Sequence, residues 1–168
     1  MATPRRRSPR HFFVWVGLIG AMAIGFNTWL DHQENPNRNP QTVIDEQGSR
    51  EVTLEQNRAG HYLAQGKING HPVTFMLDTG ASHVSIPESV ARDIGLTAGT
   101  PMIARTANGT IQVHRTQLGH VSIGGITQRD VRGSINPYMD GEKILLGMSF
   151  LGDLDFTQSG GTLTLRQQ

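Results

Sequence analysis

Apolar residues are distributed differently in two regions of the chain. Residues 12–30 form a nearly unbroken apolar run, in which Asn27 and Thr28 are the strongly polar members. This run has close to the ~20 residues that a helix needs to cross a bilayer. From Gly60 onward, short apolar segments are separated by Gly and Asn, which is typical of strands joined by tight turns. The pattern predicts one membrane-length helix followed by a mostly β domain.

Turn residues place several hairpins in the β domain. Asn-Gly at 69–70 separates two strand-like runs, and this dipeptide is a strong signal for a two-residue hairpin turn. Similar pairs of runs surround Asn-Gly at 108–109, Gly-Gly at 124–125 and Gly-Gly at 160–161. A short helix is predicted in "IPESVARDIGL", where proline suits the first turn and glycine the end. Strands and helices do not alternate regularly, so a Rossmann-type fold is disfavoured.

The flanks of the apolar run predict its direction in a membrane. Four arginines lie in residues 1–11, whereas Asp31 and Glu34 follow the run. The positive-inside rule therefore makes residues 1–11 a cytoplasmic basic tail and places the rest of the chain across the membrane. Trp15 and Trp29 lie near the two ends of the run, where interfacial aromatic rings are favoured.

A cleavable signal peptide is the alternative to an anchor. Ala21-Met22-Ala23 resembles a small-x-small cleavage site, and cleavage near Ala23 would release a secreted protein. The apolar run continues through Ile24 to Leu30 beyond that site. The length of the run therefore favours an uncleaved transmembrane signal anchor at residues 12–30.

Composition limits the remaining possibilities. Residues 31–57 are rich in Asn, Pro, Gln and Glu, which predicts a polar linker before a domain at 58–168. The net charge of +1 falls to about −3 without the four N-terminal arginines, so no nucleic-acid surface is expected. The sequence has no Cys, which excludes disulfides and thiol chemistry. Seven His are scattered without metal-ligand spacing, so we expect no metal.

The segment "VTFMLDTGASHVSI" contains the strongest candidate for chemistry. Asp78 directly follows a strand-like apolar run, and a buried carboxylate is costly unless it is paired, hydrogen-bonded or functional. Thr79 and Gly80 supply a hydroxyl and room for close backbone approach. Hydrolysis of a peptide by water needs both a base and an acid, and two carboxylates that share one proton provide both.

Three segments resemble landmarks of the retropepsin-like (retroviral-type) aspartic proteases. "FMLDTGASHVSIP" resembles the active-site signature of that family. "KILLGMSFLGDLDF" resembles the second landmark, in which Leu145, Leu146 and Gly147 would pack beside the catalytic loop. "RTANGTIQV" stands where the family has its flap hairpin, and Asn108 and Gly109 are the candidates for the flap tip that closes over a peptide.

The resemblance covers residues 60–168 in the right order and implies a small closed β-barrel of the retroviral-type acid protease kind. One or two short helices belong to that barrel, and one transmembrane helix precedes it. The resemblance implies that Asp78 is the catalytic carboxylate and that the active-site loop continues through Thr79, Gly80, Ala81 and Ser82. It also implies peptide hydrolysis by an activated water, with no cofactor, no metal and no covalent intermediate.

A second Asp-Thr-Gly or Asp-Ser-Gly does not occur in the sequence. The resemblance therefore implies a homodimer, in which each protomer contributes one Asp78. The small domain and the N-terminal run make the chain similar to the bacterial membrane-anchored branch of the family. That branch implies a single-pass protein of the bacterial inner membrane, with its catalytic domain in the periplasm and polypeptides as substrates.

Some positions depart from the family pattern or need a second interpretation. Many retroviral-type enzymes have an acid at the position of Ser82 and an Arg at the position of Met148, and both residues stabilise the dimer and the loop in those relatives. His83 follows the motif, but a residue so placed is interpreted as a packing or rim residue. The alternative to a protease is a non-catalytic module of the same fold that binds an extended peptide by strand addition, with Asp78 only structural.

Overall fold

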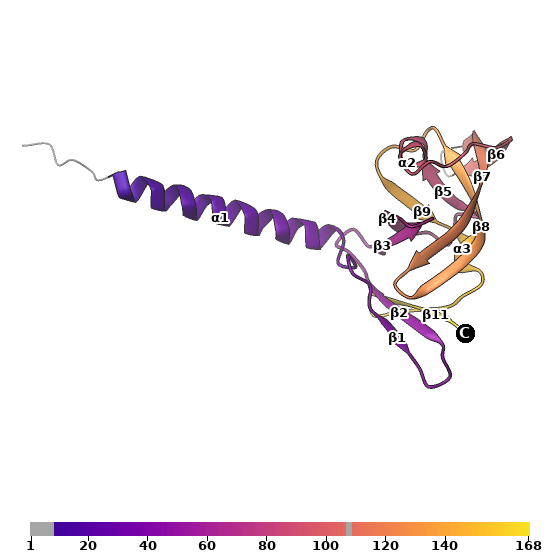
Figure 1. Cartoon of the computed structure of the whole chain (residues 1–168), viewed down its shortest axis with the longest axis horizontal. Coiled ribbons are helices and arrows are strands. Elements are labelled where there is room, and N and C mark those ends of the chain that lie inside the picture. Colours follow the sequence, from indigo (N-terminus) through magenta and orange to yellow (C-terminus); the bar gives the residue numbers. More distant parts are fainter. Residues whose placement is uncertain (1–8, 107–108) are drawn as a thin grey trace, which may run out of the picture.

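One long helix projects from a body of β-strands in the computed structural model, which describes residues 9–106 and 109–168 (Figure 1). This helix is α1 (Pro9–Glu34). Its apolar stretch Phe12–Leu30 is 19 residues long with a mean hydropathy of 1.6, and none of it is buried against the body. Helix α1 therefore has the length and composition of a membrane anchor or a signal sequence.

A closed sheet forms most of the body. Among the described residues the strand order is β3-β4-β9-β5-β8-β7-β6, and β3 also pairs with β7. This additional pairing, which sets Ile68 opposite Val121, joins the sheet into a ring. The strands are β3 (Leu63–Ile68), β4 (His71–Leu77), β5 (Val84–Pro87), β6 (Pro101–Thr106), β7 (Gly109–Ile123), β8 (Ile126–Asn136) and β9 (Lys143–Leu146). The mostly β fold predicted from the sequence is confirmed.

The turns predicted at residues 69–70, 124–125 and 160–161 and the predicted short helices are present. Asn69 and Gly70 have φ values of 50° and 86°, the left-handed conformations that a two-residue hairpin turn requires, and they join β3 to β4. Helix α2 (Glu88–Asp93) begins directly after Pro87. Helix α3 (Met148–Leu151) follows β9 at once.

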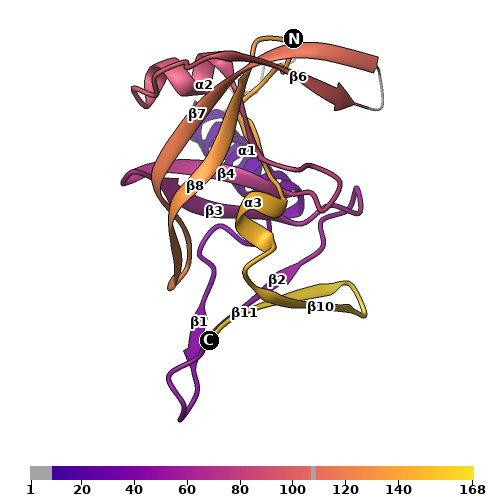
Figure 2. The ribbon, with the colours of Figure 1, turned by 90° about the vertical axis from the view of Figure 1, so that its right-hand side faces the viewer.

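A second, four-stranded sheet corrects one prediction. Its order is β1-β2-β11-β10, and it lies below the closed sheet in Figure 2. The strands are β1 (Thr42–Ile44), β2 (Arg50–Glu55), β10 (Asp155–Ser159) and β11 (Thr162–Gln167). Strands β1 and β2 lie within residues 31–57, which the sequence predicted to be a polar linker.

The pattern of β2 explains this difference. Val52 and Leu54 alternate with polar residues, pair with Leu165 and Leu163 of β11, and are fully buried. They belong to the same core as the closed sheet. The largest fully buried side chains of that core are Phe75, Phe150, Leu54, Leu63, Ile68, Ile86, Leu118, Ile123, Ile126, Ile144, Leu146 and Leu151.

Candidate active site

Parallel pairing of β4 with β9 fixes the position of Asp78. Leu77 is the last residue of β4 and lies opposite Leu146 in the ladder. The backbone N–H of Asp78 then donates to the carbonyl of Leu146 (3.1 Å). On the other side of β4, the N–H of Leu77 donates to the carbonyl of Tyr62 (3.0 Å). The strand end that carries Asp78 is therefore held from both sides.

The loop after β4 turns around the Asp78 carboxylate. The N–H of Gly80 donates to Asp78 Oδ1 (2.8 Å), and the N–H of Ala81 donates to the Asp78 carbonyl (3.2 Å). Asp78 is half-buried, and Thr79, Gly80 and Ser82 are exposed. The sequence predicted a buried carboxylate at Asp78, whereas in the single chain one side of this loop is open to solvent. The reason is that β4 ends at Leu77, so the loop lies at an edge of the body.

The second landmark lies directly behind the loop. The backbone N–H groups of Met148 and Ser149 donate to the carbonyls of Ala81 (2.7 Å) and Ser82 (3.1 Å). A Cβ atom at Gly147 would stand within 2.5 Å of the Ala81 carbonyl oxygen. Only glycine allows the start of α3 to approach the loop this closely. Of the two leucines before it, Leu146 is buried, and Leu145 is half-buried.

Ser149 adds a bracing contact that was not predicted from the sequence. Its Oγ accepts a hydrogen bond from the N–H of Val84 (3.1 Å) and donates one to the carbonyl of Arg132 (2.7 Å). Ser149 thus joins the end of the loop to β8. A serine in a short apolar helix carries no recognisable spacing signal, so only the tertiary structure identifies this role.

A cleft of about 600 Å³ lies between the loop and the β6–β7 hairpin. Among the described residues that line it, Asp78 is the only acidic one. The apolar part of the lining comes from both hairpin strands and from Leu145. The lining residues are Asp78, Gly80, Ala81, Ser82, His83, Ser85, Met102, Ile103, Ala104, Arg105, Thr106, Ile111, Val113, Ser134, Asn136 and Leu145. The Asp78 motif supplied the first four of these residues, the second landmark supplied Leu145, and the predicted flap segment supplied Arg105, Thr106, Ile111 and Val113. The sequence did not predict Met102, Ile103, Ala104 or the β8 residues Ser134 and Asn136 as part of the cleft.

Described residues of the segment predicted to be the flap lie in the β6–β7 hairpin (Figure 2). Gly109 is the first residue of β7 and pairs with Thr106. Asn108, the other residue predicted for the flap tip, lies outside the described residues. Thr106 Oγ1 donates to the Gly109 carbonyl (2.9 Å), which closes the described part of the hairpin. The side chain of Ile103 is 65% exposed on this hairpin.

Positive charge lies near His83, which lines the cleft. Partial burial lowers the pKa of His83 below its usual value of 6.5, and the nearby guanidinium groups of Arg132 and Arg115 lower that pKa further. The His83 imidazole is therefore neutral at neutral pH. In the described part of the chain, no three His, Cys, Asp or Glu side chains gather at metal-binding distances. The described residues of the cleft thus offer one carboxylate, on a loop that is braced from behind and open in front.

Comparisons with known proteins agree with this geometry. Residues 64–153 match the model of the family described as "gag-polyprotein putative aspartyl protease". A Sinorhizobium sp. protein described as "Uncharacterized protein in cobV 5'region" is 32% identical over 119 residues, which are 69% of this chain. The chain spans 51% of the length of that relative.

A solved structure has a similar fold. The crystal structure of a retropepsin-like aspartic protease from Rickettsia conorii matches with a TM-score of 0.58 and 24% sequence identity. The match covers 76% of this chain and 94% of the solved one. With the family match over more than half of the sequence and the Asp78 loop at the head of a cleft, the chain belongs to the retropepsin-like aspartic protease family.

Proposed function

We propose that the chain is a membrane-anchored aspartic endopeptidase that is active as a homodimer. The observation that carries this proposal is the half-built site: one Asp78 carboxylate, braced from behind by β9 and α3, on a loop whose other side is open. A second copy placed against that open side would bring the partner's Asp78 to the same cleft. A two-fold axis through the loop makes this arrangement self-complementary.

Two carboxylates a few Å apart cannot both be ionised, so they share one proton. In the proposed dimer the ionised carboxylate accepts a proton from water while the water oxygen bonds to the peptide carbonyl carbon. The protonated carboxyl of the pair donates its proton to the carbonyl oxygen, which gives a tetrahedral diol. The apparent pKa values of such a site belong to the pair and not to either residue alone.

Collapse of the diol completes the proposed reaction. The C–N bond breaks as the nitrogen takes a proton from the carboxyl that received one from water. A hydroxyl proton of the diol returns to the other carboxylate, and the products are a carboxylic acid and an amine. The pair then has the protonation state in which it started, so neither a metal nor a covalent intermediate is needed in this scheme.

Surface around the loop supports a second copy as the partner. Met148 is 37% exposed and lines a hollow of about 190 Å³ with Thr79 and Ser82. On the β10 side, Phe156 is 41% exposed and lines a smaller hollow that Thr79 also borders. Apolar groups beside an otherwise polar loop are typical of protein interfaces. Met148 would then supply apolar contact where many retroviral-type relatives have an arginine.

The cleft supports an extended polypeptide as substrate. The cleft lies between the Asp78 loop and the β6–β7 hairpin. Ile103, Ile111 and Val113 of the hairpin make its wall apolar. Thr79, Gly80, Ala81 and Ser82 would form the floor beside Asp78. Closure of the hairpin, whose tip would include Asn108 and Gly109, would exclude water from the bound peptide.

Helix α1 supports anchoring in a bacterial inner membrane with the β body in the periplasm. The apolar span is long enough to cross a bilayer, and the arginines before it favour a cytoplasmic N-terminus. Confinement of protomers to one membrane raises their effective concentration, so a weak dimer would still assemble there. Secretion after cleavage near Ala23 is the alternative that this proposal excludes.

The proposal is tested with the full chain in lipid vesicles and a mixed peptide library as substrate. We expect Asp78→Asn to reduce the cleavage rate by at least ~10²-fold, because it removes the shared proton. The matched control is Asp93→Asn, which changes an exposed aspartate outside the cleft and is expected to leave the rate unchanged. The wild-type rate is expected to rise faster than linearly with protein density in the vesicles. Full activity of Asp78→Asn would contradict the proposal.

A further inference from the structure

The junction between α1 and the β body is folded and closely packed. The helix ends at Glu34, and Asn35 and Asn37, which follow within three residues, are both only 7% exposed. Figure 1 shows the helix running straight to the body without an extended segment between them. Polar side chains that are this buried need hydrogen-bond partners, and the body supplies them.

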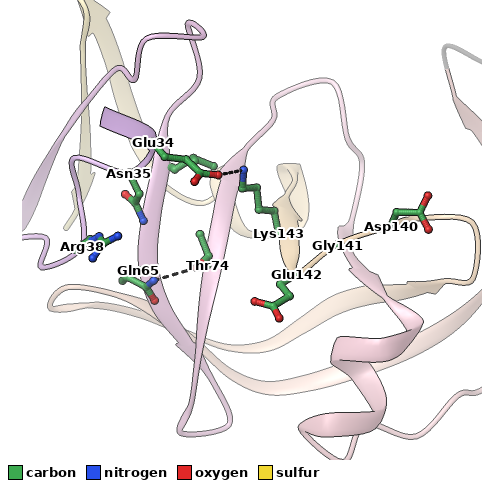
Figure 3. A pocket seen from close by; sticks show the side chains of 10 residues that line it. Glu34, Asn35, Arg38, Gln65, Thr74, Asp140, Gly141, Glu142 and Lys143 are labelled. Atoms are coloured by element: carbon green, nitrogen blue, oxygen red, sulfur yellow. Dashed lines mark hydrogen bonds and ion pairs between the residues drawn. The ribbon is translucent and has the colours of Figure 1, made fainter. Parts of the chain in front are cut away.

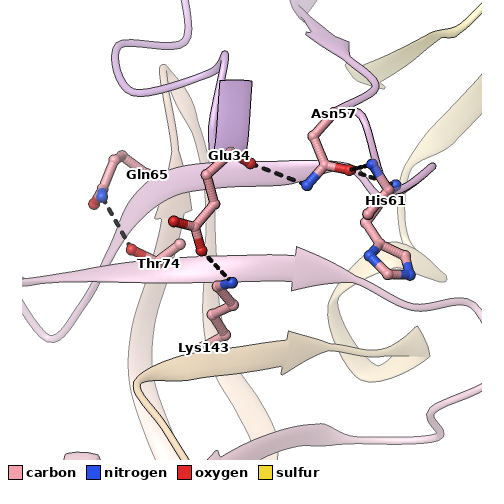
Figure 4. Close-up of polar contacts among 7 residues, drawn as sticks. Glu34, Asn57, His61, Gln65, Thr74 and Lys143 are labelled. Atoms are coloured by element: carbon pink, nitrogen blue, oxygen red, sulfur yellow. Dashed lines mark hydrogen bonds and ion pairs between the residues drawn. The ribbon is translucent and has the colours of Figure 1, made fainter. Parts of the chain in front are cut away.

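Glu34 is held by two separate parts of the body (Figure 4). Its Oε1 accepts a hydrogen bond from Lys143 Nζ of β9 (2.6 Å), and its backbone carbonyl accepts one from Asn57 Nδ2 (3.0 Å). The Asn57 side chain is itself fixed, because its Oδ1 accepts from the N–H groups of Ala59 (3.0 Å) and His61 (2.9 Å). The last turn of the helix is thereby bonded to the segment before β3 and to β9, the neighbour of β4.

Asn37 joins the junction to two strands at once. Its Nδ2 donates to the carbonyls of Glu55 (2.9 Å) and Leu63 (2.6 Å), and its Oδ1 accepts from the N–H of Glu55 (2.7 Å). Its backbone carbonyl accepts from the N–H of Gln65 (3.0 Å), and its N–H donates to Asn35 Oδ1 (3.0 Å). All polar groups of Asn37 therefore have hydrogen-bond partners within the fold, which fixes its position.

A polar cavity beside the junction limits how deeply the body can approach a bilayer. The cavity has a volume of about 820 Å³, and Glu34, Arg38, Asp140, Glu142 and Lys143 contribute charged side chains to its lining (Figure 3). Charged groups are costly to bury in hydrocarbon. This face is therefore suited to the level of the lipid headgroups, directly above the apolar part of α1.

This junction and a flexible tether differ greatly in the distances that they allow between the apolar part of α1 and the β body. Four residues separate Leu30 from the helix end, which is about 6 Å at 1.5 Å per residue. If residues 31–57 were a random coil, their ends would be separated by roughly 30 Å on average, with a wide distribution. The contacts of Glu34 and Asn37 with the body restrict this range of positions.

We propose that the junction at residues 34–37 is a fixed spacer that holds the catalytic cleft at one height above the membrane. The substrates are then polypeptides attached to the same membrane, cut in an extended segment at one short distance from the bilayer. This inference rests on the proposed function, because it requires both the anchor and proteolysis. It adds a positional rule for substrate selection, set by Glu34, Asn37 and Lys143 and not by residues of the cleft.

The test uses full-length chain and substrate in the same vesicles. Each substrate has one transmembrane helix, a rigid helical spacer of increasing length and then the peptide that the wild-type protein cuts best in a mixed library. The same peptide without an anchor is added as an internal control. Three enzymes are compared: wild type, a variant with seven helix-forming residues inserted after Leu30, and a variant with twelve Gly/Ser residues inserted there.

Each enzyme has a distinct expected result. Wild type cuts at least ~10-fold faster at one or two adjacent spacer lengths than at the others. The seven-residue insertion adds two helical turns, so its optimum moves outward by about 10 Å. The Gly/Ser insertion broadens the optimum over most spacer lengths. The free peptide is cut at equal rates by all three enzymes.

Two results overturn the inference, and the control separates them from failure of the proposed function. If wild type cuts all anchored substrates equally while it cuts the free peptide, the fixed spacer is wrong and the protease remains. If the helical insertion leaves the optimum in place, the junction does not set the height. If wild type cuts neither the free peptide nor any anchored one, proteolysis itself is refuted, and the spacer inference falls with it.

Discussion

The loop that carries Asp78 and the junction that follows α1 are both held by hydrogen bonds to backbone groups. They differ in how many of their polar groups remain accessible to solvent. At the junction, Asn37 is 7% exposed and all of its polar groups have partners in the same chain. At the loop, α3 satisfies the carbonyls of Ala81 and Ser82 from behind. The Asp78 carboxylate and Thr79 remain accessible on the other side.

The junction is therefore a structural element whose polar groups all have partners within the chain, whereas the loop is a site with polar groups still open to a partner. Buried polar groups need hydrogen-bond partners because water cannot reach them, and at the junction the chain supplies those partners itself. A half-exposed carboxylate on a loop that is braced from behind can contact a group from outside the chain, as the proposed dimer requires. Mutations on the two sides should therefore affect different quantities: stability at the junction, and both stability and activity at the loop.

The largest effect is expected from Gly147→Ala. The added Cβ would collide with the backbone carbonyls of Ala81 and His83, which cannot move without displacing the loop. We expect a loss of about 3 kcal/mol in the free energy of unfolding, at the upper end of the cost of overpacking, together with loss of cleavage. Chemical denaturation and the peptide assay measure the two effects. Gly20→Ala is the control, because no atom lies within 4 Å of its added Cβ.

Asn37→Ala tests the junction without touching the cleft. The change leaves the N–H and carbonyl of Glu55 and the carbonyl of Leu63 without their side-chain partner. We expect a loss of about 2–3 kcal/mol in the free energy of unfolding, with an unchanged rate on free peptide under native conditions. The exposed Asn39→Ala is the matched control and should change stability by less than ~0.5 kcal/mol. Equal stability of the two variants would refute the structural role of Asn37.

Ser149→Ala should have a smaller effect on stability than either change above. It removes one bond from the N–H of Val84 and one to the carbonyl of Arg132, which costs about 1–2 kcal/mol. Because Ser149 braces the end of the active-site loop, we also expect a lower rate of cleavage at saturating substrate. Ser159→Ala, on the exposed β10 strand, provides the comparison. A variant with normal stability and normal rate would show that the brace is dispensable.

The smallest expected effect is the pH dependence that arises from His83. Its pKa in the folded chain is lowered below 6.5 by partial burial and by Arg132 and Arg115, so the unfolded chain binds the proton more readily. The His83 contribution to stability is complete above pH 6.5 and is lost as the pH falls through the lowered pKa. We expect His83→Gln to reduce the slope of stability against pH below 6.5. Identical slopes for variant and wild type would contradict this assignment.

Local sequence signals predicted the parts of the molecule whose geometry depends on neighbouring residues. Asn69-Gly70 identified a hairpin because few residues adopt left-handed backbone conformations easily. The run before Asp78 and the leucines before Gly147 identified the two segments that meet at the loop. In each case a few adjacent residues carry the physical requirement, so the pattern is visible without the fold.

The parts that the sequence did not predict depend on partners far along the chain. Strand β2 lies in a polar stretch and becomes a strand because β11, at the opposite end of the domain, pairs with it. Asn37 looks like any polar residue until Glu55 and Leu63 surround it. The half-exposure of Asp78 likewise depends on the loop lying at an edge of the body, which no local pattern reveals.

The central claim, that each protomer supplies half of the active site, is tested most directly by mixing protomers. At a protein density where the rate per wild-type chain no longer rises with density, so that nearly all chains are paired, a fixed amount of wild-type chain is reconstituted into vesicles with increasing amounts of Asp78→Asn chain. The cleavage rate on free peptide is then measured. Random pairing predicts that the rate falls to about half at an equal mixture and continues to fall with excess variant, because mixed dimers lack one carboxylate. Asp93→Asn chain should cause no such fall. A rate that stays constant in excess Asp78→Asn would show that one chain suffices and would contradict the account.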